Sequence, residues 1–575
     1  MAKTNLRVAG AAALGIAALV GTIGAQVNRG TTEWLTAGGD AQRTFWIRTD
    51  PRISVAGVSQ PSFGLQWTAD LGSRTRGLSG LGQGVSANGV TLFIPMTVIG
   101  GTANNIYALD NDTGYVVWQR RFEGTPPPVT AQCPGGTVAT TRIVPLAPPA
   151  TAAAPAGGGG GGATQAYRSV LGEPGQGAPV EVRGRGPGPA AGPPAAGAPA
   201  AAGAPAAGRG PAPAAPAPAA PPGAAAARAG GPSIPGATLE QLGGGRGGLG
   251  RPSGVAYAVS SDGALHVVGL PSGKDIQRPT EFLPSNARWS DTIAVNTTLY
   301  ATTTGNCGGA PNAIWAADLD SDAKPVVSWK TDGGPMVGRV AFGTDGTLFA
   351  AVGPGPTTSS GGRSNAIVAL DPKTLQVKDW FTQTGVEFVT GPMVFKQKDV
   401  ELVAAGTKDG RVIVLNATAL GGADHATARA SGMLEGAGGS IAADALASWQ
   451  DASGTPWILA ATTNGVVTAK LADSGGRLNL ERGWTAPNLA APATPIIVNG
   501  VVFALATGRS STPAGRGTPA VLHAYDGVSG KELWTSGRGM TAPAYAGSFW
   551  SAFSQVYVGT SDGRLHAFGL PDERR

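Results

Sequence analysis

The chain has 575 residues and a formal net charge of +6, from 42 Lys and Arg against 36 Asp and Glu. Lys3 and Arg7 contribute two positive charges, and residues 151–251 contribute four more, from seven Arg and three Glu. The rest of the chain is neutral overall. This distribution argues against a nucleic-acid-binding surface, because phosphate recognition needs clustered positive charge on a folded domain.

Residues 1–25 have the pattern of a secretory signal peptide. Lys3 and Arg7 lead into an uncharged stretch at residues 8–24, and Gly24-Ala25 provides a small-residue cleavage site. An uncleaved anchor is the alternative, although this weakly hydrophobic stretch is short for spanning a bilayer. We expect an exported protein, periplasmic or secreted, with no transmembrane segment after cleavage.

Six tryptophans follow a period of about 50 residues, which is typical of repeat architectures. They form three pairs whose two members are 50 or 51 residues apart: Trp67 and Trp118, Trp329 and Trp380, and Trp484 and Trp534. The gap from Trp380 to Trp484 corresponds to two periods with one tryptophan missing. The gap from Trp118 to Trp329 is about two periods plus an excess of roughly one hundred residues, which indicates an insertion.

The sequence around these tryptophans repeats as well. Ala108–Trp118 and Ala524–Trp534 share the phrase Ala-x-Asp-x-x-Thr/Ser-Gly-x-x-x-Trp. A second repeated phrase places Asp-Gly or Asn-Gly between alternating apolar runs, as in residues 406–415 and 559–569. Such pairs favour type I′ hairpins, because both central positions need positive φ. Each period therefore predicts a small antiparallel meander with a tryptophan on its last strand.

This pattern resembles the repeat of the pyrroloquinoline quinone (PQQ) dehydrogenase-like β-propellers, as found in exported bacterial proteins. The resemblance covers residues 34–145 and 252–571 and implies an all-β, eight-bladed propeller of four-stranded antiparallel blades. A strand within residues 63–71, carrying Trp67, is expected to pair with the C-terminal strands at 541–571 and close the ring. The resemblance also implies that the six periodic tryptophans dock neighbouring blades. A WD40 propeller fits poorly, since no Gly-His or Trp-Asp pair recurs at the period.

Residues 147–251 consist almost entirely of Ala, Gly and Pro, and account for the long gap. They divide the predicted propeller into residues 26–146 and 252–571 and interrupt one blade. Because such a segment cannot bury enough apolar surface to offset the entropy of ordering it, we expect it to be disordered. Two interpretations of this segment are left open: a tether to the cell envelope, and a neutral expansion of a surface loop.

Residues for catalysis are few. The four His do not pair at a metal-ligand spacing, and the chain lacks nucleophile-elbow, zincin and haem-attachment motifs, so no haem is expected. The only two cysteines, Cys133 and Cys307, are candidates for a disulfide in an exported protein. Two buried reduced thiols are the alternative, since sequence spacing does not give the distance between the two Cα atoms.

The resemblance implies positions for a cofactor. In PQQ-dependent alcohol dehydrogenases the quinone lies between a tryptophan floor and a vicinal disulfide, above a Ca²⁺ ion. Trp289 matches the floor, Asn306 matches a Ca²⁺ ligand, and Cys133 stands where the vicinal pair is expected. Pro311 replaces the catalytic Asp, although Asp291 is a candidate base. The alternative is structural: Trp289 packs at the start of a strand, and Asn306 fills a left-handed turn position.

Two functions follow from these features. The first is a non-catalytic binding or scaffold module of the cell envelope, monomeric, with a protein or other envelope component as its partner and no required cofactor. The second is a divergent dehydrogenase that uses PQQ and Ca²⁺ to oxidise alcohols or sugars. Trp289 and Asn306 favour the second function, whereas Pro311 and the lone Cys133 favour the first.

Overall fold

The computed structural model describes most of the chain outside the two segments predicted to lie apart from the propeller. The described residues are 33–74, 80–88, 95–123, 133, 137–146, 254–356, 363–434, 440–463, 465–509 and 517–571. The predicted signal peptide, residues 1–25, and the predicted insertion, residues 147–251, lie outside them. Within the described residues no helix is long and apolar enough to cross a membrane.

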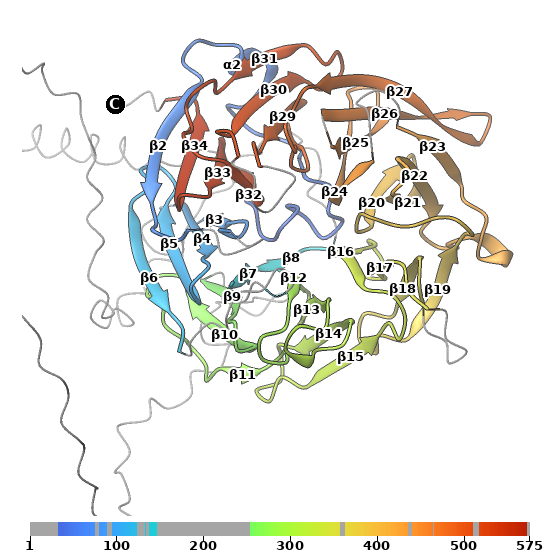
Figure 1. Cartoon of the computed structure of the whole chain (residues 1–575), viewed down its shortest axis with the longest axis horizontal. Helices are drawn as coiled ribbons and strands as arrows, with labels where there is room; N and C mark the ends of the chain where they lie inside the picture. Colours follow the sequence, from blue (N-terminus) through green and yellow to red (C-terminus); the bar gives the residue numbers. More distant parts are fainter. Residues whose placement is uncertain are drawn as a thin grey trace, which may run out of the picture. The chain divides into compact units, whose positions relative to one another are not determined.

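Eight small sheets form a ring, and we number these blades 1 to 8 in chain order (Figure 1). Blade 1 contains β3 (Val85–Asn88), β4 (Pro95–Gly100), β5 (Asn105–Asp110) and β6 (Val116–Arg121), and blade 2 contains β7 (Ala139–Thr141), β9 (Val255–Val259), β10 (Ala264–Gly269) and β11 (Thr280–Glu281). Blade 3 contains β12 (Trp289–Val295), β13 (Thr298–Thr303), β14 (Ala313–Asp318) and β15 (Val326–Lys330), and blade 4 contains β16 (Met336–Phe342), β17 (Leu348–Val352), β18 (Ala366–Leu370) and β19 (Val377–Thr382).

Blade 5 contains β20 (Met393–Gln397), β21 (Val400–Gly406), β22 (Arg411–Asn416) and β23 (Ala430–Met433), and blade 6 contains β24 (Ile441–Gln450), β25 (Pro456–Thr462), β26 (Gly465–Ser474) and β27 (Arg477–Pro487). Blade 7 contains β28 (Ile496–Val498), β29 (Val501–Ala506), β30 (Val521–Asp526) and β31 (Glu532–Thr535), and blade 8 contains β32 (Ala544–Ala552), β33 (Gln555–Thr560), β34 (Arg564–Gly569) and β2 (Gly64–Asp70). The remaining elements are short: β1 (Trp46–Ile47), β8 (Ile143–Val144), α2 (Val55–Val58) and the 3₁₀ turns Cys307–Gly309 and Gly422–Asp424.

The predicted eight-bladed propeller is confirmed, with two additions at its inner edge. Strands within each blade are antiparallel, but β8 adds to β12 in blade 3, and β1 adds to β28 in blade 7, both in parallel. The inner strands of the blades, which include β3, β12, β16, β24 and β32, lie nearest the centre of the ring (Figure 1). Both additions thus lie toward the axis.

The N-terminal strand closes the ring, as predicted. β2 pairs with β34 in antiparallel register, with Trp67 opposite Ala567, and becomes the outermost strand of blade 8. In Figure 1 the blue β2 lies beside the red β34. Blade 8 therefore combines the two ends of the propeller sequence, and the ring closes through backbone hydrogen bonds.

Three of the periodic tryptophans dock on the next blade in the same way. The indole nitrogens of Trp67, Trp118 and Trp484 donate to the backbone carbonyls of Asn111, Leu270 and Gly527 at 2.9, 2.6 and 2.9 Å. Each ring lies on a glycine of the receiving turn, and a Cβ added there would approach the ring to 2.3–2.6 Å. Those glycines, Gly114, Gly273 and Gly530, have φ of +71°, +67° and +72°. The glycine of the repeated phrase is thus the receptor for the tryptophan of the preceding blade in blades 1 and 7, and Gly273 has the same role in blade 2.

The other three tryptophans meet different receptors. Trp329 packs against the cluster containing Leu375, which stands in place of the glycine with φ of +55°. Trp380 stacks on His425 with ring centroids 3.8 Å apart, and Trp534 meets Phe63 edge-on at 5.0 Å. Docking is therefore retained where the glycine is lost, with a side chain as the opposing surface.

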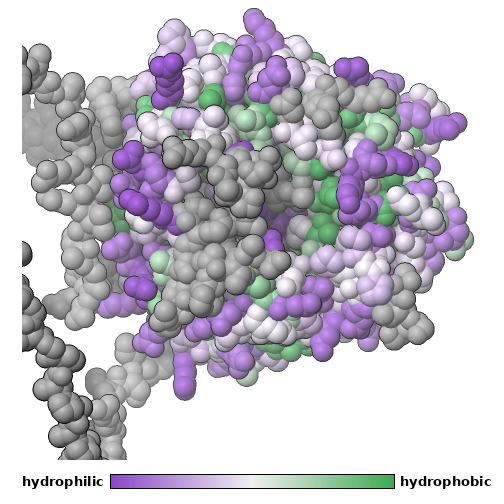
Figure 2. All heavy atoms as spheres, viewed as in Figure 1, coloured by the Kyte–Doolittle hydropathy of each residue, from purple (hydrophilic) through white to green (hydrophobic). Residues whose placement is uncertain are grey.

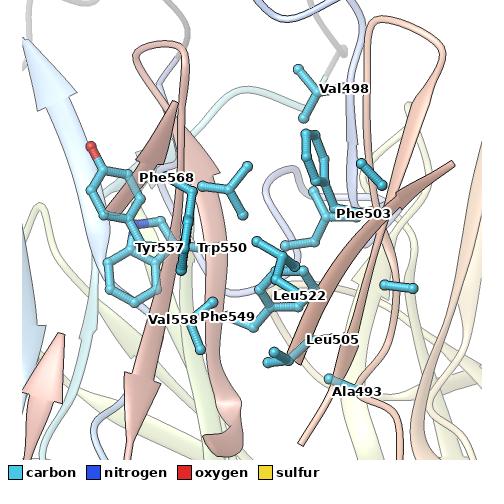
Figure 3. Packing of buried hydrophobic residues seen from close by; sticks show 14 of the residues in the cluster. Ala493, Val498, Phe503, Leu505, Leu522, Phe549, Trp550, Tyr557, Val558 and Phe568 are labelled. Carbon is cyan, nitrogen blue, oxygen red and sulfur yellow. The ribbon is translucent and has the colours of Figure 1, made fainter. Parts of the chain in front are cut away.

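Apolar side chains of neighbouring blades interlock between these docking points. Figure 3 shows this layer between blades 7 and 8, where Phe503, Leu505 and Leu522 face Phe549 and its neighbours. All four named residues are fully or almost fully buried. A four-stranded blade cannot cover both of its faces alone, so this packing between blades forms the core of the ring.

Residues 34–47, which we call the belt, line the inside of the ring. Backbone N–H groups of Ser86, Arg142, Phe342, Val394, Ser448, Ile497 and Asn499 donate to belt carbonyls at 2.8–3.0 Å. These donors come from blade 1, the link between blades 2 and 3, and blades 4, 5, 6 and 7, in that order along the belt. Gln83 connects the belt to blade 8, because its side chain accepts from Gly38 N and donates to Phe549 O. In Figure 1 the belt is part of the blue trace inside the ring.

Replacement of Gly530 by Ala is expected to destabilise the propeller by roughly 2–4 kcal/mol, because it combines a left-handed backbone with overpacking against Trp484. A Cβ at this position would lie 2.5 Å from Trp484 Cγ. Gly475→Ala is the matched control, since Gly475 has φ of +64° but open space around it; it should cost only about 1–2 kcal/mol. Equal losses for the two variants in chemical denaturation would contradict the docking role of the glycine.

Acidification is expected to destabilise blade 8 through His566. Burial lowers the pKa of His566 to about 4. Since the unfolded pKa is about 6.5, the unfolded chain binds more protons between these values, and stability is lost as pH falls from about 6.5 to about 4. The loss should reach roughly 2–3 kcal/mol. Denaturation measured at several pH values should show this component in the native chain and not in His566→Gln; an identical pH profile for both would exclude it.

Candidate functional site

The candidate cofactor residues lie at one end of the ring, which we call the Trp289 end. Trp289 begins β12, the inner strand of blade 3, and its backbone pairs with Thr303 at the end of β13. Asn306 and Cys307 follow in the turn between β13 and β14. Cys133 comes from the connection between blades 1 and 2. The fold thus brings Trp289, Asn306 and Cys133 to a common end of the ring.

Cys133 and Cys307 form a disulfide. Their Cα atoms are 5.6 Å apart, and 174 positions separate them in the sequence. The bond joins the connection that enters blade 2 to the β13–β14 turn of blade 3. It is not the vicinal disulfide that the family resemblance implies, because its two cysteines belong to different blades.

Trp289 contributes its ring to the core. It is partly buried and packs against an apolar cluster between blades 2 and 3, with members such as Tyr257, Leu265, Leu283 and Leu299. The rest of its surface is exposed. Packing of this kind matches the structural alternative for Trp289.

Asn306 occupies a left-handed turn. Its φ and ψ are 54° and 25°, it is exposed, and its side chain does not cap the following 3₁₀ turn. Its carbonyl accepts from Gly309 N at 3.2 Å. Asparagine tolerates this backbone region better than most residues, which by itself accounts for its presence.

The turn around Asn306 is held by its own hydrogen bonds. Thr303 Oγ1 donates to Pro311 O at 2.6 Å and accepts from Trp315 Nε1 at 2.8 Å. Gly305 N donates to Asn312 Oδ1 at 3.0 Å. Pro311 therefore presents no side chain that accepts a proton, and its carbonyl is already bonded.

These residues do not fit a PQQ and Ca²⁺ site well. Calcium takes six to eight oxygen ligands, several of them usually carboxylates. Within the described part of the chain, no three His, Cys, Asp or Glu side chains come together as a metal site. The side chain of Asp291 lies outside the described set. Trp289 packs against the cluster between blades 2 and 3, and Cys133 is bonded to Cys307, so both stand in surroundings other than those that the resemblance implies.

The space-filling view in Figure 2 shows hydrophobic and hydrophilic residues in small groups around the centre of the ring. Two arginines near the axis are engaged with aromatic rings. The guanidinium of Arg339 lies 6.0 Å from the Phe45 ring centroid, and that of Arg509 lies 5.3 Å from the Tyr545 centroid. The described face thus offers mixed polar and apolar contacts.

A second polar cluster, in blade 2, has the atom order of a catalytic triad. Ser260 Oγ lies 3.1 Å from His266 Nε2, and His266 Nδ1 lies 3.2 Å from the Asp275 carboxylate. Ser260 is fully buried, and its hydroxyl donates to the carboxylate of Asp262. A buried hydroxyl that already donates to a carboxylate is unsuited to nucleophilic attack, so we interpret this cluster as structural.

Asp275 extends the cluster to blade 1. Its carboxylate accepts two hydrogen bonds from the Arg120 guanidinium, at 2.9 and 2.6 Å. Burial alone would raise the pKa of Asp275, but hydrogen bonds and charges of His266 and Arg120 outweigh it and hold this pKa below its ordinary value. The cluster therefore adds an ionic link between blades 1 and 2, beside the docking of Trp118.

Comparison with known proteins supports the fold. No protein-family model and no curated protein matches the sequence. Among solved structures, quinohemoprotein alcohol dehydrogenase from Comamonas testosteroni matches with a TM-score of 0.52 and 13% identity, over 95% of this chain and 82% of that one. The chain has the propeller fold of the quinoprotein alcohol dehydrogenases.

Two further structures place limits on that likeness. A europium-containing methanol dehydrogenase matches with a TM-score of 0.51 and 10% identity, over 95% of this chain and 99% of that one. BamB from Moraxella catarrhalis matches with a TM-score of 0.37 and 13% identity, over 56% of this chain and 80% of that one. Identities this low show the fold alone, and the BamB score carries no argument.

Sequence reasoning missed two sets of residues. The belt has no repeat signal, because residues 34–47 occur once and precede the first period. The blade 2 cluster had a signal: Ser260-x-Asp-Gly with His266 recurs as Thr560-x-Asp-Gly with His566. In blade 8 the Thr560 hydroxyl lies 3.3 Å from His566 Nε2, which repeats the contact.

Replacement of both Cys133 and Cys307 by Ser is expected to destabilise the ring by roughly 2–4 kcal/mol, mainly because the unfolded chain loses a constraint over a long loop. Denaturation of the native and double-serine chains would measure this difference. Reduction of the native chain should lower its stability by a similar amount and leave the double-serine variant unchanged. Two reactive thiols in the unreduced, denatured native chain would show that the disulfide is absent.

Proposed function

We propose that this chain is a non-catalytic binding or scaffold module, exported from the cytoplasm, with a propeller of the quinoprotein type. The observation that carries the proposal is that the turn between β13 and β14, at the Trp289 end, has Pro311 in place of an acidic side chain. At the position where an alcohol-oxidising relative would need a carboxylate base, this chain has Pro311, whose carbonyl accepts from Thr303. General-base catalysis needs a side chain within reach of the substrate proton.

The remaining candidate residues support the same proposal. Trp289 packs in the core between blades 2 and 3, Asn306 fills a left-handed turn, and the disulfide stabilises two loops. Each of these residues thus has a structural role that needs no cofactor. The neutral charge of the propeller residues favours a protein or another envelope component as the partner, in preference to nucleic acid.

A PQQ- and Ca²⁺-dependent dehydrogenase is the second candidate. The observation in its favour is geometric, since Trp289, Asn306 and the disulfide lie at the same end of the ring. If the quinone binds, it would supply the oxidant for an alcohol or a sugar. Trp289 and Asn306 would then contact it or its cation, and Asp291 would be the candidate base.

The two candidates differ in cofactor retention. We expect that the purified exported chain, incubated with PQQ and CaCl₂ and then desalted, will retain no stoichiometric quinone absorbance and will not reduce an electron-acceptor dye with alcohols or sugars. Trp289→Ala and Trp534→Ala are compared with the native chain, because Trp534 docks blades far from the candidate site. Stoichiometric quinone that is lost in Trp289→Ala and kept in Trp534→Ala would refute the non-catalytic proposal.

A further inference from the structure

The inner wall of the ring consists of strand edges. Within its four-stranded blade the inner strand pairs on one side only, and its other side presents N–H and C=O groups to the axis, where β8 pairs with it in blade 3 and β1 in blade 7. Unpaired edges of this kind recruit other extended segments. Buried backbone groups also need hydrogen-bond partners, because an unpaired one is costly.

Seven N–H groups of the inner wall each donate a hydrogen bond to one carbonyl of the belt. The accepting carbonyls belong to Trp34, Leu35, Ala41, Gln42, Thr44, Phe45 and Ile47. Strand β1 and the isolated bridge between Trp34 and Ser86 are the points where this pairing becomes regular. The belt is thus bound through its backbone, by strand-like pairing near its two ends and by single hydrogen bonds along the turns between them.

Side chains of the belt fix its register. Arg43 Nε donates to Val340 O at 2.9 Å, and Thr36 Oγ1 donates to Thr292 O at 3.2 Å. Gln42 Nε2 donates to Phe342 O at 3.2 Å. Arg43, Thr36 and Gln42 are at most 3% exposed. Buried polar groups bonded to particular wall carbonyls provide sequence specificity beyond that of the backbone contacts.

The conformation of the belt is imposed by the wall. Arg43 and Phe45 have φ of 61° and 56°, a left-handed region that is costly for residues other than Gly, Asn and Asp. Residues held in this way persist only where the surroundings determine them. Phe45 is 1% exposed, and its ring meets that of Trp34 edge-on at 6.2 Å. The contacts with the ring therefore offset a local cost in the belt.

The belt is joined to the rest of the chain through the surface. Arg48 is partly exposed and Thr49 is exposed, whereas Asp50 is anchored again by accepting from Arg52 N, Ile53 N and Ser554 Oγ. A cut after Arg48 would thus separate the belt from the ring without touching either set of contacts.

We propose that the inner wall of the propeller is a binding site for one peptide segment, and that residues 34–47 occupy it as a tethered ligand that holds the eight blades in a single closed ring. The ligand is this chain's own segment, and the site recognises its backbone carbonyls together with Arg43, Thr36 and Gln42.

The test uses the full chain with a protease site inserted between Arg48 and Thr49, cleaved after folding. We expect the belt to remain bound through gel filtration, and the melting temperature of the cut chain to rise with added peptide 34–47, because a ligand of the folded state stabilises it by mass action. A labelled peptide should exchange into the cut chain. The same peptide with Arg43 replaced by Ala should bind at least about tenfold more weakly, since it loses charge-assisted hydrogen bonds.

Two controls separate the belt from nicking in general. A cut at Ala452–Ser453, in the surface turn between β24 and β25, should give a melting temperature that does not respond to the peptide. A peptide with the belt residues in scrambled order should not bind the chain cut after Arg48. The proposal is overturned if the belt leaves and the ring melts as the uncut chain does, or if native and scrambled peptides raise the melting temperature equally.

Discussion

The backbone edges of the blades are the constraint on which the rest of this structure depends. Each blade has an inner edge facing the axis and an outer strand facing solvent, and neither is satisfied within the blade. At the inner edge, the belt supplies carbonyls to N–H groups from blade 1 round to blade 7, and Gln83 extends this contact to blade 8. At the outer strand, tryptophans bind the turn of the next blade. A ring of weakly self-sufficient sheets is thereby held from both sides.

Both of these devices use the N-terminal part of the chain. Residues 34–47 form the belt, and β2, at Gly64–Asp70, completes blade 8 and carries Trp67 to blade 1. Between them, Asp50 and Asn499 tie the connecting segment to blades 7 and 8. One stretch of fewer than 40 residues thus contacts every blade. Ring closure is therefore a property of this stretch, and the periodic blades supply the surface on which it acts.

The periodic part of the fold was predictable because the period is itself a docking contact. A tryptophan in one blade and a glycine in the next must recur together, as in Trp484 and Gly530, so their spacing records the ring. Where one partner changes, the other contacts adjust: His425 provides the surface for Trp380 in blade 5, which has no periodic tryptophan of its own. The number of blades and the closing strand followed from this periodicity together with the family resemblance that the repeated residues carry.

The belt and the candidate site did not follow from it, for different physical reasons. The belt binds mainly through backbone carbonyls, which leave no trace in side-chain identity, and its left-handed residues are Arg43 and Phe45 rather than glycines. The candidate site could be located but not interpreted. Trp289 and Asn306 have the residue types of a cofactor site and also of a packed strand end and a turn, and only burial and backbone angles distinguish these roles.

Blade 2 shows how far the ring tolerates interruption. Its inner strand β7 and the next strand β9 are adjacent in the sheet but more than one hundred residues apart in the sequence, and only three residue pairs join them. Closing such a loop costs only slightly more than closing one of half its length, by about 0.6 kcal/mol.

The blade is also held from outside: Arg142 Nε donates to Val255 O, Trp118 Nε1 donates to Leu270 O, and Arg142 N donates to Leu35 O of the belt. The Cys133–Cys307 disulfide joins the connection into blade 2 to blade 3. Neighbouring blades and the belt therefore provide the stability that an interrupted blade cannot provide through its own connection.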